Sequence, residues 1–369
     1  MTECLLACGL SFLVTVLMIM WLRAYAPRFG LVDEPGGRKH HHGTVPLVGG
    51  LGMFAGVVVF AITVAFVLGG EWPRQQTVLL GTLSLLVLKG YLDDRYDLRA
   101  SLRFLVQALA VLMMIYWGGI RLDNLGNLFG TGDVILGRWA VPMTIFGVLG
   151  VINAINMIDG VDGLAGGLAF VSLLALTGFA LAGGFLGETL LLPLLAAVAG
   201  FMLFNARTPW RPQASVFMGE AGSVLLGFSL AWYAVDFASV RQVFTPVTAV
   251  WILAIPLMDT IALMVRRVLK GRSPLSPDRE HLHHILQRAG FSQCQTVSIV
   301  LALSALLAGV GIVGWYLGVP EYVMFYAFMA LFCLYLYGVM HAWKLMKAIK
   351  RAHGDLEEST IILKTRHHD

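Results

Sequence analysis

The sequence predicts an all-α integral membrane protein with about eleven transmembrane helices. Hydrophobic residues make up 58% of its 369 positions and charged residues only 13%, and the mean hydropathy is +0.77. This composition is typical of membrane-spanning helices. The apolar runs are continuous and do not alternate with polar residues, which excludes a transmembrane β-barrel. The net charge of +4 is too small to indicate a nucleic-acid partner, and the four cysteines form no CxxC pair that would indicate a zinc site.

Each predicted helix is an apolar run long enough to cross about 30 Å of hydrocarbon. The runs lie at 3–22, 46–68, 75–91, 102–119, 139–158, 163–183, 187–205, 215–235, 244–265, 295–316 and 321–342. The fifth and sixth runs nearly touch, so ten or twelve spans are alternatives. Because no soluble domain interrupts the runs, residues 1–369 are predicted to form a single polytopic domain.

The distribution of lysine and arginine predicts the orientation of these helices. Of the 26 Lys and Arg residues, 21 lie in the loops after the odd-numbered runs and in the C-terminal tail, and four lie in the other loops. The positive-inside rule therefore predicts a periplasmic N-terminus and a cytoplasmic C-terminus, with a cytoplasmic tail at 344–369. The acids and histidines gather in the same cytoplasmic loops, at about 24–45, 92–101, 153–163, 205–223 and 266–290.

Two of these loops carry carboxylates beside apolar helix ends. Asp93 and Asp94 are adjacent at the end of the third run, where carboxylates normally persist only with a cation or a proton to hold. The alternative is a helix-end charge cluster paired with Arg95 and Arg99. In the next loop, Asn156, Asp159 and Asp162 interrupt a long apolar stretch, with glycines that let the backbone turn and approach a ligand. A plain turn would need those glycines but not the polar side chains.

A third loop begins at Asn205 and ends where the eighth run opens with Phe217, Gly219 and Glu220. A carboxylate in the first turn of a helix is favoured by the helix dipole, which is the structural alternative for Glu220. Phe217 alone would be an interfacial aromatic residue. Beside Gly219 and an acid, it indicates a platform for stacking a nucleobase.

The fourth loop, at 266–288, holds three histidines and two arginines of interest: His281, His283, His284, Arg267 and Arg279. No thiols accompany them, and imidazole with guanidinium suits a diphosphate better than a transition metal. The alternative is simply a positively charged inner loop. A weaker basic segment at 38–46 is either a phosphate-binding loop or an anchor for anionic lipid headgroups.

Together, these carboxylates and cations at one membrane face predict phosphoryl transfer that depends on Mg²⁺, with Mn²⁺ as the alternative ion. Carboxylate oxygens suit such hard cations, which share the phosphates of the substrate. Basic groups nearby stabilise a transferring phosphoryl group. The residues alone do not name the substrates.

The motifs, in this order, resemble those of the polyprenyl-phosphate N-acetylhexosamine-1-phosphate transferases. The matching strings are LVDEPGGRKHHHGTVPLVGG, LDDRYD, NAINMIDGVDGL, FMGEAGS and SPLSPDREHLHH, which are jointly very specific. Within the family, the resemblance is strongest to the bacterial branch that transfers GlcNAc-1-phosphate from UDP-GlcNAc to undecaprenyl phosphate. It implies a bacterial inner-membrane enzyme, working as a homodimer, at the first membrane step of O-antigen or common-antigen type glycan synthesis.

The resemblance also implies roles for individual residues. Asp93 and Asp94 would lie beside the lipid phosphate, and Glu220 would ligate Mg²⁺. The nucleotide and catalytic pocket would be lined by Asn156, Asp159, Asp162, Asn205, Phe217 and Gly219, with Phe217 stacked on uracil. The diphosphate or sugar would be held by His281, His283, His284, Arg267 and Arg279.

Two departures from the family pattern matter. The family usually has Asp at the position of Glu220, and one extra methylene shifts a carboxylate by about 1.5 Å. The muramoyl-pentapeptide branch carries a lysine three residues after its Asp pair, where this chain has Asp97. That argues against UDP-MurNAc-pentapeptide, which stays an alternative beside other UDP-2-acetamido sugars.

Rival functions and mechanisms remain open at this point. A CDP-alcohol phosphatidyltransferase shares the start of the Asp159 motif, but Gly166 and Gly167 stand where that class has Ala and Arg. A transporter would place its ionisable groups near the membrane midplane. For the transferase itself, direct attack by the lipid phosphate and a covalent aspartyl intermediate are both compatible with the residues.

Overall fold

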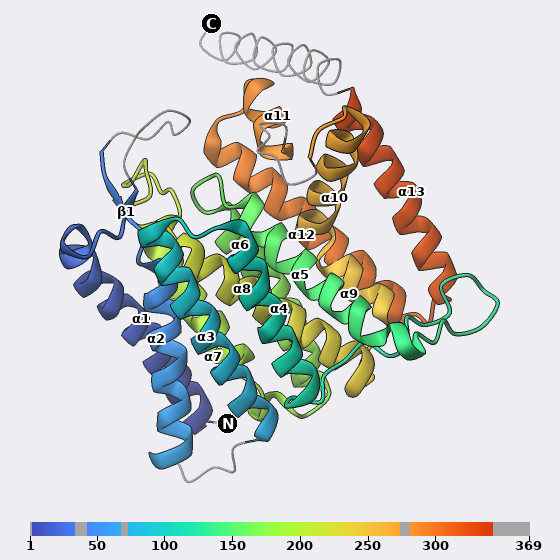
Figure 1. The fold of residues 1–369 in the computed structure, drawn as a ribbon, viewed down its shortest axis with the longest axis horizontal. Coiled ribbons are helices and arrows are strands. Elements are labelled where there is room, and N and C mark those ends of the chain that lie inside the picture. The colour runs from blue at the N-terminus through green and yellow to red at the C-terminus, as the bar shows by residue number, and fades with distance from the viewer. Residues whose placement is uncertain (1, 34–42, 68–72, 274–280, 342–369) are drawn as a thin grey trace, which may run out of the picture.

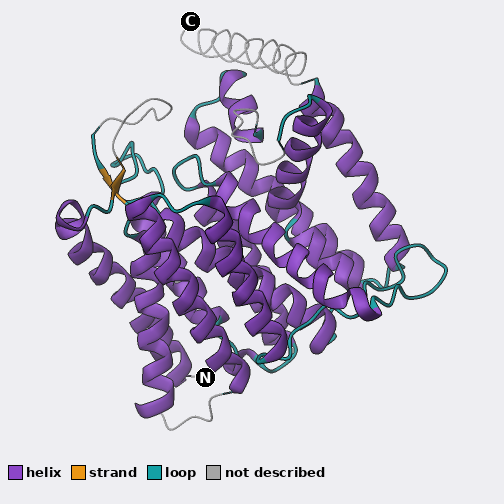
Figure 2. Cartoon of the chain, in the orientation of Figure 1, coloured by secondary structure: helices purple, strands orange, loops and turns teal. Residues whose placement is uncertain are grey.

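The computed structural model describes residues 2–33, 43–67, 73–273 and 281–341, which form a bundle of helices with one short sheet (Figures 1 and 2). The predicted tail at 344–369 and Arg279 lie outside these residues. The α-helices of the first half are α1 (Thr2–Phe29), α2 (Gly49–Ile62), α3 (Arg74–Tyr96), α4 (Ala100–Tyr116), α5 (Ala140–Ile158) and α6 (Leu164–Ala182). Those of the second half are α7 (Leu191–Asn205), α8 (Gly219–Val235), α9 (Pro246–Ile252), α10 (Ala254–Leu269), α11 (Leu282–Arg288), α12 (Gln293–Tyr316) and α13 (Glu321–Met340).

Short elements extend or connect these helices. Two π-helical turns, Thr63–Val67 and Asp236–Val240, continue α2 and α8, and 3-10 turns lie at Gly137–Trp139 and Leu186–Glu188. Strand β1 (Val32–Asp33) pairs antiparallel with β2 (Val45–Pro46).

Every apolar run of the sequence contains a helix, but the runs differ in how well they suit a membrane. Among the described residues, seven helices are long and apolar enough to cross one, or eight if one bent pair forms a single span. Helices α4 and α7 are shorter, and α3 carries polar residues such as Lys89. The chain is therefore an all-helical, multi-pass membrane protein.

The bent pair is the ninth predicted run, which the structure divides. Helix α9 ends at Ile252 and α10 begins at Ala254, and the two axes differ by 84°. Pro256 lies in the first turn of α10, where its missing N–H leaves no helical hydrogen bond unmade. The sequence predicted one helix here because hydropathy does not distinguish a straight span from a broken one.

Helix α8 is the centre of the bundle and packs against α2, α3, α5, α6 and α9 (Figure 1). From Ala221 to Ala234 every residue of α8 is buried. Near its beginning, α2 and α3 come so close that a side chain at Gly50 would collide with the backbone of Gly222, and one at Gly90 with that of Ala221. The start of α8 is thus fixed against two neighbouring helices.

The chain before α2 joins the same end of the bundle through backbone hydrogen bonds. Phe217 N donates to Pro46 O, and Gly49 N donates to Phe217 O at 3.0 Å. Gly50 N donates to Met218 O at 2.9 Å. This end, uppermost in Figure 1 with β1 and α11, carries the predicted site residues.

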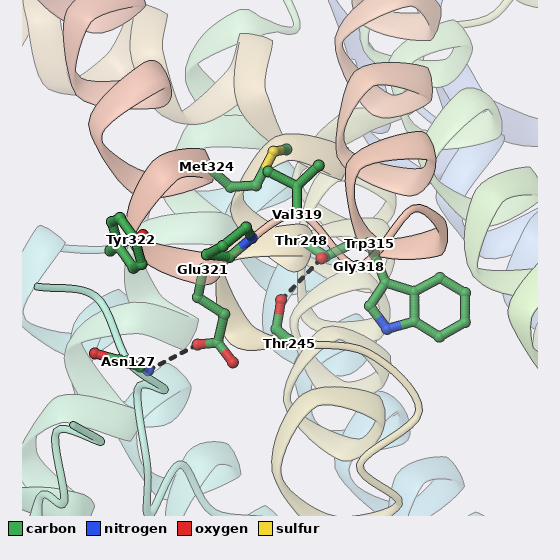
Figure 3. A pocket seen from close by; sticks show the side chains of 10 residues that line it. Asn127, Thr245, Thr248, Trp315, Gly318, Val319, Glu321, Tyr322 and Met324 are labelled. Carbon is green, nitrogen blue, oxygen red and sulfur yellow. Dashed lines mark hydrogen bonds between the residues drawn. The ribbon is translucent and has the colours of Figure 1, made fainter. Parts of the chain in front are cut away.

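A pocket of about 400 Å³ lies at the opposite end, between the beginnings of α9 and α13, the end of α12 and the loop before α5 (Figure 3). Glu321 accepts a hydrogen bond from the Asn127 backbone N–H at 2.8 Å, and Thr245 is hydrogen-bonded to Thr248. None of the predicted site residues lines this pocket. It is therefore separate from the candidate site.

Candidate active site

The structure brings Asp94 onto the beginning of α8. Asp94 Oδ1 accepts a hydrogen bond from Glu220 N at 2.8 Å, and Oδ2 lies 3.4 Å from Ala221 N. A carboxylate at this position satisfies N–H groups that the helix cannot pair and is favoured by the helix dipole. Asp94 thus links the end of α3 to the residue proposed from sequence to ligate a metal.

Gly219 makes this approach feasible. Its φ is +68°, a conformation that side-chain-bearing residues rarely adopt, and a Cβ there would lie 2.6 Å from Asp94 Oδ2. Glycine is required here both by the backbone and by the neighbouring carboxylate.

We expect Gly219→Ala to displace Asp94 and to lower the catalytic rate about tenfold or more. Gly318→Ala is the matched control, because Gly318 has the same φ of +68° at the opposite end and no atom within 4 Å of the position that a Cβ would take. If backbone strain were the only effect, both variants would lose the same thermal stability. Gly219→Ala would then show no larger loss of catalytic rate than Gly318→Ala. Equal turnover in the two variants would contradict the proposed contact.

Asp93 is held differently from its neighbour. Its buried carboxylate is paired with Lys89 Nζ at 2.8 Å and with Arg103 at 2.9 Å, and it accepts the Leu98 N–H. The helix-end ion cluster that the sequence offered as an alternative exists for Asp93, although its cations are Lys89 and Arg103. Asp94 is not part of it, so the two adjacent acids have different surroundings.

The Glu220 carboxylate contacts Asn156 of α5 and also lies near the two cations that pair with Asp93. Its Oε1 accepts a hydrogen bond from Asn156 Nδ2 at 2.8 Å, and its Oε2 lies 3.6 Å from Lys89 Nζ. Arg103 is 3.9 Å from Oε1, and Asn156 Nδ2 also lies 2.9 Å from Ser223 Oγ. The carboxylate is partly exposed, with 25% of its side chain accessible, so it can still meet a ligand.

Asp159 directly follows the last residue of α5 and lies near the carboxylates of Glu220 and Asp94. Burial, together with the negative charges of Glu220, Asp94 and Asp162, raises its pKa to about 7, and burial is the largest cause. Asp94, in the last turn of α3 beyond the apolar stretch, has its pKa raised to about 7, again mainly by burial and partly by Glu220. At neutral pH each of these carboxyls is therefore only about half ionised, and a nearby cation would favour the charged form.

Asp162 and Asn205 shape the loop beside these acids. Asp162 is paired with Arg207 at 2.8 Å and accepts the Ala214 N–H. Asn205 is buried, accepts the Gly163 N–H and donates to Val216 O. These contacts connect the Asp159 loop to the segment that leads into Phe217, whose ring is partly exposed.

The three histidines lie on and just before α11. His281 and His283 are buried with parallel rings whose centroids are 5.4 Å apart, and the His284 ring is 4.2 Å from that of His283. His283 Nε2 lies 3.4 Å from the position of a Cβ at Gly160, next to Asp159. The structure therefore brings the histidine segment against the Asp159 loop, two segments far apart in the sequence.

The histidines differ in charge. Burial, together with the neighbouring histidines, lowers the pKa of His283 to about 3, so its imidazole is neutral. Neither ring nitrogen of His283 has a hydrogen-bond partner among the described residues. His283 is thus a neutral, buried imidazole whose hydrogen-bonding groups are not used by the described residues. Arg267 is buried in the last turn of α10.

The donor groups suit a magnesium ion that takes one or two protein carboxylates, but within the described part of the chain they do not form a complete set of protein ligands. Among the described residues, no three His, Cys, Asp or Glu side chains are close enough to hold a metal together. Mg²⁺ usually takes only one or two carboxylates and completes its shell with water and substrate phosphates. Asp94, Asp159 and Glu220 supply hard oxygen ligands of that kind.

Several residues of the site were not found from the sequence. Lys89, Arg103 and Asp259 are buried or half-buried charged residues in helices α3, α4 and α10. A charged residue inside an apolar run needs a partner, which was the available signal. Its partner could not be identified, because the pairing depends on how the helices pack.

Comparison with known proteins identifies one family model and a group of relatives that share one name. Residues 76–238 match the family model described as glycosyl transferase family 4. The chain is 40% identical over 354 residues, 94% of each chain, to the undecaprenyl-phosphate α-N-acetylglucosaminyl 1-phosphate transferase of Escherichia coli strain K12. Proteins of the same name match at 39% identity in Haemophilus influenzae, over 94% of this chain and 97% of the relative, and at 40% in Yersinia pestis, over 92% of each.

Proposed function

Because the chain belongs to glycosyl transferase family 4, the family of its undecaprenyl-phosphate α-N-acetylglucosaminyl 1-phosphate transferase relatives, we propose that it transfers GlcNAc-1-phosphate from UDP-GlcNAc to undecaprenyl phosphate. The products are undecaprenyl-diphosphate-GlcNAc and UMP, at the first membrane step of O-antigen or common-antigen type glycan synthesis. Family membership sets aside the transporter and CDP-alcohol phosphatidyltransferase alternatives. The structural observation that carries the proposal is the convergence of Asp94, Asp159 and Asn156 on Glu220.

The proposal includes a topology. The eleven apolar runs would cross a bacterial inner membrane with the N-terminus in the periplasm and the site at the cytoplasmic face. The positive-inside bias supports this orientation, and the separation of the acidic end from the opposite pocket is compatible with it. Dimerisation is an expectation from the family resemblance alone.

The residues of the site would act mainly by position and charge. A lipid phosphate, with a second pKa of about 6, is already mostly dianionic near neutral pH, so it needs positioning more than deprotonation. Through the cation that they favour at this position, Asp94 and Asp159 would orient it for attack on the β-phosphorus of the nucleotide sugar. Phe217 would stack on the base, and the His281 to His284 segment with Arg267 would contact the diphosphate or sugar.

Mg²⁺, or Mn²⁺ in its place, would be held by Glu220 and at most one of the neighbouring carboxylates of Asp94 and Asp159, with water and substrate phosphates completing its shell. When bound, the ion would neutralise charge on the diphosphate and stabilise departing UMP. The raised pKa values of Asp94 and Asp159 support a cation at this position.

The proposal is tested by UMP release from purified protein. UDP-GlcNAc should give UMP only with undecaprenyl phosphate and Mg²⁺ or Mn²⁺ present, and chelation should stop it. Other UDP-2-acetamido sugars and UDP-MurNAc-pentapeptide should turn over more slowly. No UMP from any of them would refute the assignment, and preference for another sugar would correct the substrate.

Direct attack is the mechanism that we propose. UMP should then not exchange into UDP-GlcNAc when the lipid is absent, as isotopically labelled UMP would reveal. Exchange without lipid would instead indicate a covalent sugar-phosphate on an aspartate.

We expect Glu220→Asp to lower turnover about tenfold or more and to raise the Mg²⁺ concentration needed. Shortening the side chain withdraws the carboxylate by about 1.5 Å, which breaks the hydrogen bond from Asn156 and lengthens the approach to Lys89. A hydrogen bond to a charged group is worth about 1.5–3 kcal/mol. Glu188→Asp, which shortens an outer glutamate paired with Arg241, is the control. An unchanged Mg²⁺ requirement and turnover in Glu220→Asp would show that the reach of Glu220 is unimportant.

A further inference from the structure

Asp259 is a carboxylate in α10 that the proposed mechanism does not use. It is 1% exposed and lies within an otherwise apolar stretch. An isolated carboxylate there is costly to bury, so its partners are informative. They come from two other elements, α11 and α13.

Three donors bind the Asp259 carboxylate. Oδ2 lies 2.7 Å from His281 Nδ1, while Oδ1 accepts the Leu282 N–H at 3.0 Å and the Tyr335 hydroxyl at 2.6 Å. Because an ionised carboxylate only accepts, His281 Nδ1 carries the proton of this bond. The other ring nitrogen, Nε2, is then the one left for a ligand.

The same region is packed so that His281 cannot easily turn. His281 is 6% exposed, and Ile285 of α11 packs with Ala262 and Leu263 of α10 and Val339 of α13 in a small apolar cluster. Its ring is parallel to that of His283, which in turn lies against Gly160 beside Asp159. The orientation of one imidazole is thus connected by contact to the acidic loop.

We propose that Asp259 and Tyr335 are positioning residues that fix the ring and tautomer of His281, so that Nε2 faces the phosphosugar. The inference rests on the proposed function, since it assigns a role to residues behind that site. A carboxylate that orients a histidine through Nδ1 is a known way of setting which nitrogen acts, and its loss usually costs 10- to 100-fold. Asp259 also binds the first N–H of α11, so a purely structural role is the alternative to exclude.

A double-mutant cycle separates the two roles. We expect Asp259→Asn to lower kcat for UMP release about 10- to 100-fold with less than about threefold change in KM for UDP-GlcNAc. In a His281→Gln background the same change should cost less than about twofold, because its effect passes through His281. Equal losses in both backgrounds would overturn the proposal. Tyr335→Phe, which removes one of three hydrogen bonds, should cost about two- to tenfold.

Asp236→Asn is the matched control for losing a buried carboxylate. Asp236 is fully buried at the opposite end and pairs with Arg241 at 3.2 Å. This variant should keep the wild-type kcat, even where its thermal stability falls as much as that of Asp259→Asn. If Asp236→Asn loses kcat equally, general destabilisation explains the Asp259 result and the proposal fails.

A spectroscopic measurement decides the matter even if His281→Gln has no measurable turnover. In protein labelled with ¹⁵N-histidine, the His281 ring signals, assigned from their absence in His281→Gln, should show a proton on Nδ1. Asp259→Asn should change that state, and an unprotonated Nδ1 in the wild type would overturn the proposal. Because the signals do not depend on turnover, this result stands apart from the fate of the proposed function.

Discussion

Asp94→Asn and Asp159→Asn are each expected to lower UMP release by about 100- to 1,000-fold while the protein stays folded. The loss follows from removing a charge that is fixed where the reacting phosphates meet the site. Asparagine keeps the acceptor that pairs with the N–H of Glu220, and it is a good residue at a helix N-terminus. Turnover and thermal unfolding of the detergent-solubilised protein are the measurements.

The stability change should have the opposite sign from the activity change. The pKa of Asp159 is raised from 3.8 to about 7 in the folded state, so the folded state binds a proton more tightly than the unfolded state. This contribution to stability is fully present below about pH 4 and is lost as pH rises through about 7. In chelator, wild type should therefore become less stable between those values, and Asp159→Asn should show a smaller decline. Near-normal turnover in both variants would refute the site assignment.

Lys89→Met is expected to destabilise the protein by up to about 3–5 kcal/mol, the cost of breaking a buried ion pair by removing one partner. It removes the closest cation of Asp93, whose side chain is completely buried, and leaves Arg103 at 2.9 Å as the remaining charged partner. Unfolding in a titration with sodium dodecyl sulfate measures the change. Activity should fall as well, because Lys89 also lies 3.6 Å from Glu220.

A second variant distinguishes charge from packing. Lys89→Met combined with Asp93→Asn removes both members of the pair and should recover most of the lost stability, since replacing a whole buried pair is often neutral. If the double variant is as unstable as Lys89→Met alone, the loss comes from the shape of the lysine side chain, and the ion pair does not explain it.

The sequence was sufficient to predict the helical elements and to select the loops in which acids and histidines gather, while the side of the membrane on which those loops lie stays a prediction. Each apolar run except the ninth, which is divided, became one helix, because a run of this length in lipid must satisfy its own backbone hydrogen bonds. The break between α9 and α10 was missed because the prediction rested on hydropathy; Pro256, which is unfavourable inside a continuous helix but tolerated in a first turn, was the available signal. Whether short α4 and α7 cross the membrane likewise depends on their neighbours.

For the candidate site, the sequence was sufficient to identify the residues but not to predict their surroundings in the fold. The acids and histidines could be selected as candidates because ionisable residues within or beside membrane-spanning segments are energetically costly and usually functional. Their separate environments could not: Asp93 and Asp94 are adjacent, yet one is neutralised by Lys89 and the other caps α8. That difference arises because adjacent residues of a helix point in directions about 100° apart, and the groups that each one meets depend on how α3 packs against α4 and α8.

The contact between Gly90 and Ala221 has a consequence for how the protein responds to its surroundings. Asp94 and Glu220 are anchored to two helices whose backbones touch, so their separation is set by the scaffold within the bilayer. A change in lipid thickness that tilts α3 against α8 would alter the spacing of these two carboxylates directly. The rate of the reaction would then depend on the host membrane, even with every loop residue unchanged.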